Sequence, residues 1–179
     1  MKNIITAIAI GVFSLSSLAN TTSSYVGQET REIKALSQQD VLSYLNGKGL
    51  GYAKAAELNQ YPGPSHVLEM AKNLNLSEEQ VKLTQEIFNN MEERAQFLGK
   101  QFVDKEQELD HLFSKGTVDE VSLKKVLSDI GMLQSNIRFV HLSAHLEQKA
   151  LLTKHQVNLY SKFRGYNNPH NSEGHHYAH

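Results

Sequence analysis

Two long segments of the chain carry apolar side chains at steps of three and four residues. The first spans residues 77–113, and the second follows Gly116 and ends near Leu151. This spacing places the apolar side chains on one face of a helix. A helix over 77–113 would be about 55 Å long, so its apolar face needs a partner helix. We therefore predict that the two segments pack as a long antiparallel helical hairpin.

A short pattern marks where helices begin. Residues 76–80 read Leu-Ser-x-x-Gln, and residues 152–156 read Leu-Thr-x-x-Gln. In such a capping box the Ser or Thr side chain accepts a hydrogen bond from a backbone N–H, and the Gln side chain reaches back to the cap. An imperfect copy at 36–40 has Asp in place of Gln, and Thr117-x-x-Glu120 is predicted to open the return helix of the hairpin.

Shorter helices are predicted on both sides of the hairpin. One covers about 37–58, although it contains three glycines that weaken a helix. A turn at 61–64 with two prolines separates it from a helix over 66–73 capped by Ser65. A last helix covers about 154–164. Because no segment alternates as a strand does, the predicted class is all-α, with the shorter helices packed on the hairpin.

Residues 1–19 have the features of an export signal. Lys2 is the only charged residue before Glu29, and residues 17–19 supply small side chains before a cleavage site. The uncharged stretch is shorter than the roughly 20 residues that span a bilayer. We expect cleavage after residue 19, with an uncleaved anchor as the alternative. A flexible linker at 20–35, a helical domain at 36–164 and a disordered His-rich tail at 165–179 complete the predicted organisation.

Composition excludes several classes of function. The 18 basic and 19 acidic side chains give a net charge of −1 with no basic run, so we expect no nucleic-acid partner. No nucleophile motif is present, and we expect no enzymatic activity. The chain has no cysteine, so packing or oligomerisation must hold it together in an oxidising compartment. A hairpin leaves much apolar surface uncovered, and we expect a homodimer.

A histidine pair is the strongest candidate for chemistry. His141 and His145 are four residues apart and share a helix face, so both imidazoles can reach one divalent transition metal such as Zn, Cu, Ni or Co. The alternative is that both are ordinary histidines at the edge of the core. The absence of a His-Glu-x-x-His pattern argues against a metalloprotease.

Further ligands are expected from the opposite helix and from the turn at 61–64. If the hairpin turns near residues 115–117, residues whose numbers sum to about 232 face each other, which places Met91 opposite His141. Glu57 and His66 bracket the turn, and Glu69 lies one helical turn after His66. For Met91 ordinary packing is the alternative, and for Glu57 a solvated helix end. The tail histidines at 170, 175, 176 and 179 could separately capture metal.

An export signal, a helical hairpin and the paired Leu-[Ser/Thr]-x-x-Gln motifs together resemble the Spy/CpxP family of periplasmic proteins, over about residues 36–164. Its relatives include ZraP-like and CnrX-like proteins of heavy-metal resistance and sensing. The resemblance implies a periplasmic location and a cradle-shaped dimer that binds unfolded envelope proteins or acts on a membrane signalling protein. CnrX-like members imply a metal site in which a His-x-x-x-Met matches residues 141–145. Their N-terminal His-x-x-x-His has no match in this chain.

Two functions follow from these observations. The first is a transition-metal-binding sensor or resistance accessory protein that uses His141, His145 and His66. The alternative is a metal-independent chaperone whose hairpin surface holds apolar client segments. The near-neutral charge favours the first, because a strongly basic concave face would be expected of the second.

Overall fold

The computed structural model describes residues 22–166 of the chain. It divides into two compact units, whose described parts are residues 22–30 and residues 31–166. Residues 24–30 form consecutive turns, in which the Gln28 N–H donates to the Tyr25 carbonyl at 2.9 Å. The predicted signal at 1–19 and residues 167–179 of the predicted tail lie outside the described residues.

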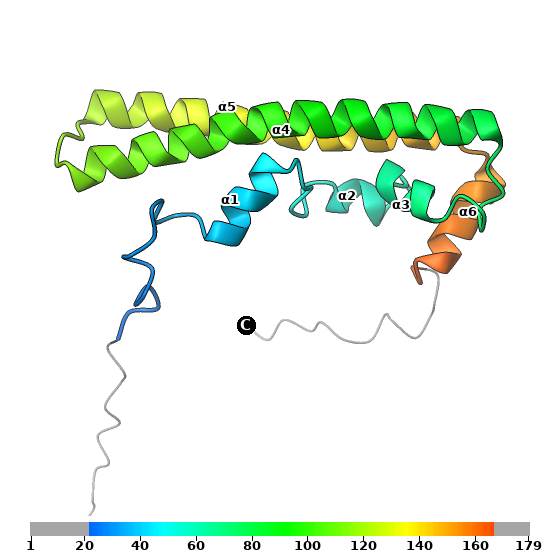
Figure 1. Ribbon diagram of the computed structural model, residues 1–179, viewed down its shortest axis with the longest axis horizontal. Helices are drawn as coiled ribbons and strands as arrows, with labels where there is room; N and C mark the ends of the chain where they lie inside the picture. Colours follow the sequence, from blue (N-terminus) through cyan, green and yellow to red (C-terminus); the bar gives the residue numbers. More distant parts are fainter. Residues whose placement is uncertain (1–21, 167–179) are drawn as a thin grey trace, which may run out of the picture. The chain divides into compact units, whose positions relative to one another are not determined.

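The second unit is helical, and no strand occurs among residues 22–166. The predicted all-α class is therefore confirmed, with two long helices packed side by side (Figure 1). Nε2 of Gln148, near the end of one, donates to the hydroxyl of Thr84, near the start of the other, at 3.1 Å. The helices in chain order are α1 (Gln38–Leu45), α2 (Lys54–Glu57), α3 (Pro64–Glu69), α4 (Glu78–Ser114), α5 (Glu120–Leu151) and α6 (Lys154–Phe163).

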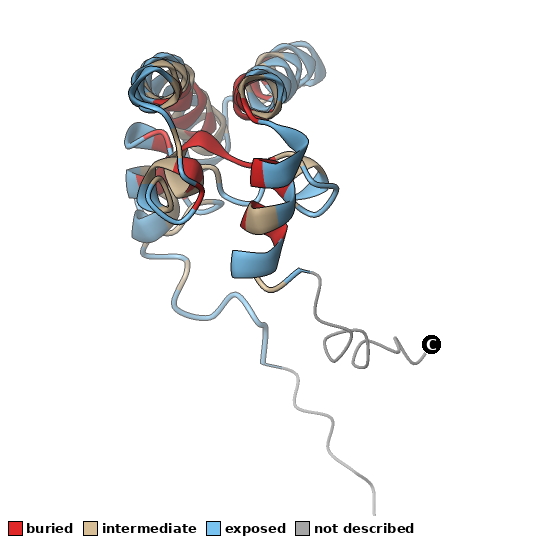
Figure 2. Cartoon of the chain, turned by 90° about the vertical axis from the view of Figure 1, so that its right-hand side faces the viewer, coloured by how far each residue is buried: buried red, intermediate tan, exposed pale blue. Residues whose placement is uncertain are grey.

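Two apolar clusters hold these helices together. The larger lies between α4, α5 and α1, and includes Phe102, Ile137 and Tyr44, whose ring lies 4.4 Å from that of Phe102. The smaller cluster includes Val67 from α3 and Tyr160 from α6, both almost fully buried. Buried residues gather where helices face one another, while the outer surfaces are exposed (Figure 2). The three short helices α1–α3 thus cover one side of the α4–α5 pair (Figure 1).

Capping boxes begin four of the helices. The three predicted for α1, α4 and α6 are present, with Ser37, Ser77 and Thr153 as caps. The box predicted at Thr117 is wrong, since α5 is capped by Asp119 with Ser122 as its partner. The Thr117 N–H instead donates to the Leu112 carbonyl and closes the end of α4. Gly116, with φ of 63°, takes the left-handed conformation of this turn.

The two Gln-containing boxes bond to each other. Nε2 of Gln80 donates to Oε1 of Gln156 at 3.0 Å, and Nε2 of Gln156 donates to Oε1 of Gln80 at 2.9 Å. Each amide also donates to a backbone carbonyl at a helix junction, that of Leu151 or that of Leu74. Each Gln oxygen still accepts from the backbone N–H of its own cap residue. These two side chains therefore join the start of α4 to the start of α6.

The short N-terminal helices differ from the prediction. The helix expected at 37–58 ends at Leu45, because Gly47 adopts a left-handed φ of 62° and a Cβ there would lie 2.9 Å from the Glu92 carbonyl of α4. Only α2 forms in the remainder. The helix expected at 66–73 is α3, which begins earlier, at Pro64, and ends at Glu69. Proline suits the first helical position because its φ is already helical and it lacks the N–H that would be unpaired there.

The packed unit also begins earlier than the predicted boundary at residue 36. Ile33 is 6% exposed and belongs to the larger apolar cluster. The Lys34 N–H and ammonium both bond to the carboxylate of Asp110 on α4. These contacts pack residues 31–35, which we had placed in the linker, against α4.

None of the helices within residues 22–166 combines the length and the apolar character that crossing a membrane requires.

We predict that Ser77→Ala and Thr153→Ala each lower the free energy of unfolding by about 1 kcal/mol, because each removes an N-cap. Urea denaturation followed by circular dichroism measures the change. Ser135→Ala, at an exposed position inside α5, is the control and is expected not to lower stability, because alanine has the higher helix propensity. Equal stability of the cap variants and the parent would contradict this role.

Candidate functional site

A cavity of about 420 Å³ lies between the long helices and the short N-terminal ones, and it gathers five of the six predicted site residues. Its walls come from α4, α5, α3, the end of α2 and the glycine-containing loop that follows α1. Glu69 does not line it. The predicted site residues in the lining are Glu57, His66, Met91, His141 and His145.

His141 is the most buried of these, with 3% of its surface exposed. Its Nε2 is buried and has no hydrogen-bond partner within the described residues. Burial, with the nearby His145 as the smaller cause, lowers the pKa of His141 to about 4. The ring is therefore neutral at physiological pH, which is the form that can bind a metal.

His145 is held in one orientation. Its Nδ1 lies 2.6 Å from the carbonyl oxygen of Tyr61, and because a carbonyl only accepts, Nδ1 must carry the proton. In the neutral ring this leaves the lone pair on Nε2. A Cβ on Gly63 would lie 3.0 Å from this Nε2 and 2.9 Å from the neighbouring Cε1. The backbone of Gly63 is extended, with φ of −84°, a conformation open to any residue. A glycine is required at this position because a side chain would collide with the His145 ring, and not because of the backbone conformation.

Glu57 brings a carboxylate to the cavity from the last residue of α2. Its Oε1 accepts hydrogen bonds from the C-terminal part of the chain, including one from the Tyr160 hydroxyl at 2.5 Å. Its Oε2 is buried without a hydrogen-bond partner among the described residues and lies 3.9 Å from Nδ1 of His145. The solvated helix end that we weighed for Glu57 does not describe this side chain, which is 14% exposed.

His66 and Glu69 mainly contact each other. Nδ1 of His66 lies 3.1 Å from Oε2 of Glu69, and their side chains are 39% and 62% exposed. The hydrogen bond to His66 holds the pKa of Glu69 below its usual value. His66 thus reaches the cavity from a wetter position than His141, while Glu69 faces solvent.

Met91 lies in the same cavity as His141, as the predicted register requires. It reaches the cavity from α4 and is partly buried. Its thioether adds a soft donor to two imidazoles and a carboxylate, a set that suits divalent transition metals better than Mg²⁺ or Ca²⁺. Among residues 22–166, however, no three His, Asp or Glu side chains gather closely enough to hold one metal ion. The donors line one cavity without converging on a point.

Sequence reasoning missed the parts of the site that depend on tertiary contacts. Gly49 lies at the cavity, where an added Cβ would be 3.8 Å from Nδ1 of His141. Gly63 was recognised only as a turn residue. The donors to Glu57 come from residues 160–166, more than a hundred positions along the chain, and no local pattern pointed to them.

No protein-family description, no curated protein and no solved structure matches this chain.

We predict that the protein loses stability as pH falls from about 6.5 toward 4. Because the pKa of His141 is about 4 when folded, against 6.5 for an ordinary histidine, the unfolded chain binds the extra proton in this window. The expected loss from this group is at most about 3 kcal/mol. Urea denaturation at a series of pH values measures it.

His141→Leu removes the titrating ring and is expected to flatten this part of the pH profile. His111→Leu, at an exposed position near the end of α4, is the matched control and should leave the profile as in the parent. A His141→Leu profile as steep as that of the parent would refute the assignment.

Proposed function

We propose that this chain is a periplasmic transition-metal-binding protein that acts in metal sensing or metal resistance and is not an enzyme. It binds one divalent ion, of Zn, Cu, Ni or Co, in the cavity between the long helices and α2–α3. His141, His145 and Glu57 are the ligands, and Met91 and His66 are further donors at the cavity wall.

The observation that carries this proposal is a pair of buried polar atoms without partners in one cavity. Nε2 of His141 and Oε2 of Glu57 have no hydrogen bond within the described residues. An unsatisfied buried polar atom costs about 1–3 kcal/mol, so such atoms are uncommon unless something engages them. A cation that accepts electron pairs from both atoms would remove this cost.

The orientation of His145 supports the same proposal. A histidine that binds metal usually donates its other ring N–H to a carbonyl or carboxylate, which fixes the ring. His145 donates from Nδ1 to the Tyr61 carbonyl and keeps Nε2 as its donor atom. Because the three ligands do not converge in the described structure, binding must draw them together. Glu57 lies on the four-residue helix α2, so α2 would move toward His141 and His145 together with the residues that bond its carboxylate.

Membership of the Spy/CpxP family is part of the proposal. It is supported by the two Leu-[Ser/Thr]-x-x-Gln motifs, whose glutamines bond each other at the end of the α4–α5 pair. The periplasmic location rests on the signal-like residues 1–19.

The proposal predicts that His141→Ala and His145→Ala each weaken binding of a transition-metal ion at least about tenfold, or roughly 1.4 kcal/mol, because each removes a ligand. Isothermal titration calorimetry with Zn²⁺, Cu²⁺, Ni²⁺ and Co²⁺ measures the affinity. The parent for these titrations is the full chain with His170, His175, His176 and His179 replaced by Gln, so that the tail does not contribute.

His111→Ala is the control for this experiment, since His111 is exposed near the end of α4, far along the helix from the cavity. Affinity should fall as the imidazole ligands become protonated in acid. If His141→Ala/His145→Ala binds metal as tightly as the parent, the cavity is not the metal site.

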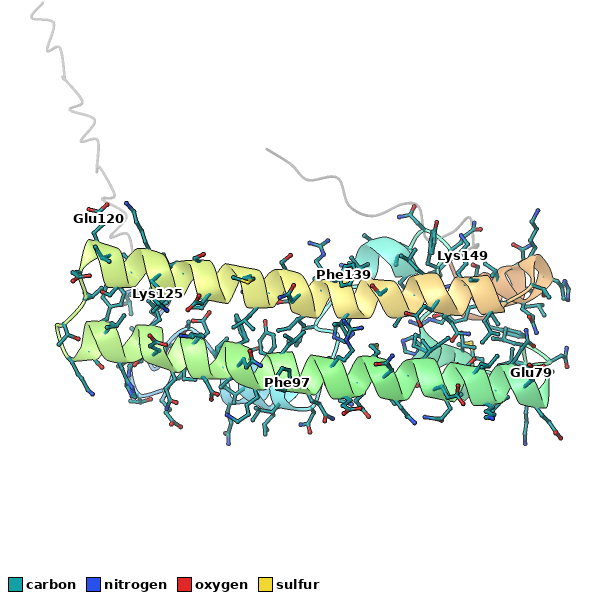
Figure 3. All side chains as sticks on the ribbon, turned by 90° about the horizontal axis from the view of Figure 1, so that it is seen from above. Glu79, Phe97, Glu120, Lys125, Phe139 and Lys149 are labelled. Atoms are coloured by element: carbon teal, nitrogen blue, oxygen red, sulfur yellow. The ribbon has the colours of Figure 1, made fainter. Side chains whose placement is uncertain are left out.

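A metal-independent chaperone is the second candidate function. It is favoured by an exposed apolar stripe on the face of α4 and α5, formed by Phe97, Met132, Phe139 and Leu146, each 58–67% exposed. Met132, Phe139 and Leu146 are spaced by seven residues and so share one face of α5. Phe97 and Phe139 border one groove between the helices (Figure 3). Apolar client segments could bind there whether or not metal is present.

We propose that a second copy of the chain covers this apolar stripe. Large side chains of this kind bury about 200 Å² each, so the exposed part of four amounts to roughly 500 Å² per copy. A stable interface buries about 800 Å² per partner, and the stripe provides more than half of it. Small residues continue the stripe along α5, since Ser135 and Ser143 lie between its large residues and Ser128 and Ala150 lie beyond its two ends.

Dimerisation is expected to be lost in Phe139→Glu, which places a charge in the middle of the apolar stripe. Sedimentation velocity of the full chain at micromolar concentrations should show a dimer for the parent and a monomer for the variant. Val121→Glu, at an exposed apolar residue in the first turn of α5, is the control. A parent that is monomeric at high micromolar concentration would contradict the dimer and leave the apolar stripe available for clients.

A further inference from the structure

We infer that the C-terminal end of α6 positions the carboxylate of the proposed metal site. Tyr160, Arg164 and Tyr166 hold Glu57 by one oxygen and leave the other for the ion, so that ion binding and docking of residues 160–166 are coupled. This inference rests on the proposed function and adds residues to it that do not themselves touch the ion.

Three donors converge on a single carboxylate oxygen. Oε1 of Glu57 accepts from the Tyr160 hydroxyl at 2.5 Å, from the Tyr166 hydroxyl at 2.8 Å and from Nε of Arg164 at 3.2 Å. Tyr160 is 1% exposed, and burial together with its bond to Glu57 raises its pKa well above the usual value.

An arginine that simply neutralises a carboxylate usually bonds both of its oxygens in a parallel fork. Here Arg164 bonds one oxygen through Nε, and the two tyrosine hydroxyls bond the same oxygen. The second oxygen is buried, has no hydrogen-bond partner within residues 22–166, and belongs to a residue that lines the cavity with His141 and His145. The arrangement fixes the carboxylate while keeping one oxygen available.

Tyr160 is a cleaner probe of this arrangement than Arg164. Removing the guanidinium would release Glu57 but would also remove a positive charge that repels a bound cation, so the two effects oppose each other. Tyr160→Phe removes the hydroxyl that donates to Glu57 and that also interacts with the backbone of Gly63, and it leaves the charge and the ring unchanged. Residues that orient a metal ligand in this way typically contribute 10- to 100-fold to affinity.

Coupling between ion binding in the cavity and docking of residues 160–166 must also be reciprocal. If docking of residues 160–166 favours the ion, the ion must favour docking by the same factor. The docked segment contains two backbone hydrogen bonds that report on it: the Arg164 N–H donates to the Tyr160 carbonyl, and the Tyr166 N–H donates to the Ser161 carbonyl. Exchange of these amide protons should slow when the ion binds.

The test measures Zn²⁺ affinity by calorimetry in the full chain with the four tail histidines replaced by Gln. Tyr160→Phe should weaken binding about tenfold, and Tyr166→Phe should weaken it in the same direction. In a Glu57→Gln background, Tyr160→Phe should have no further effect, because it acts through that carboxylate. Tyr44→Phe, which removes the hydroxyl of another buried tyrosine, is the control and should leave affinity unchanged.

Hydrogen exchange with and without Zn²⁺ gives the second readout. The Arg164 and Tyr166 amides should be protected by Zn²⁺ in the parent and not in Glu57→Gln. Tyr160→Phe and Tyr166→Phe with parental affinity would overturn the inference, as would a loss of affinity that persists in the Glu57→Gln background. If the parent itself does not bind Zn²⁺, or binds it independently of His141 and His145, the proposed function fails as well.

Discussion

The reciprocal bond between Gln80 and Gln156 joins the start of α4 to the start of α6, and the position of the C-terminal donors of Glu57 depends on this junction. Each amide completes the cap of its own helix and also donates to the other. Because the same two side chains cap their helices and bond each other, the start of α4 is tied directly to the start of α6. This places α6, with Tyr160 and Arg164, beside the α2–α3 segment, and so brings Glu57 and its donors together.

The sequence predicted the elements whose signals are local and repeated. Apolar spacing over more than thirty residues located α4 to within about a residue, whereas the cap of α5 is two residues later than predicted. Three of the four capping boxes were predicted at the right residues. The predictions from sequence failed for helix ends that are determined by contacts with other helices. The first helix stops at Leu45 because the chain must cross α4 closely at Gly47, and helix propensity carries no information about that crossing.

The candidate site divides in the same way. The pair His141 and His145 follows from spacing along one helix, and Met91 follows from the register of two helices. The position of Glu57 beside the turn could be read from the sequence. Which carboxylate oxygen remains available to the cavity is set by Tyr160, Arg164 and Tyr166 near the other end of the chain, because all three bond Oε1. Glu69 looked equivalent to Glu57 in sequence, yet it faces solvent and pairs with His66, because α3 begins at Pro64 and turns that residue outward.

The contact between Gly63 and His145 has a consequence for how this sequence can diverge. The extended backbone of Gly63 suits any residue, so the restriction comes from the imidazole, which lies where a Cβ would be. A side chain at position 63 becomes acceptable once position 145 is smaller than histidine. In descendants of this chain the two positions should therefore change together, 82 residues apart in the numbering, and a glycine kept at 63 would mark those that retain the buried imidazole.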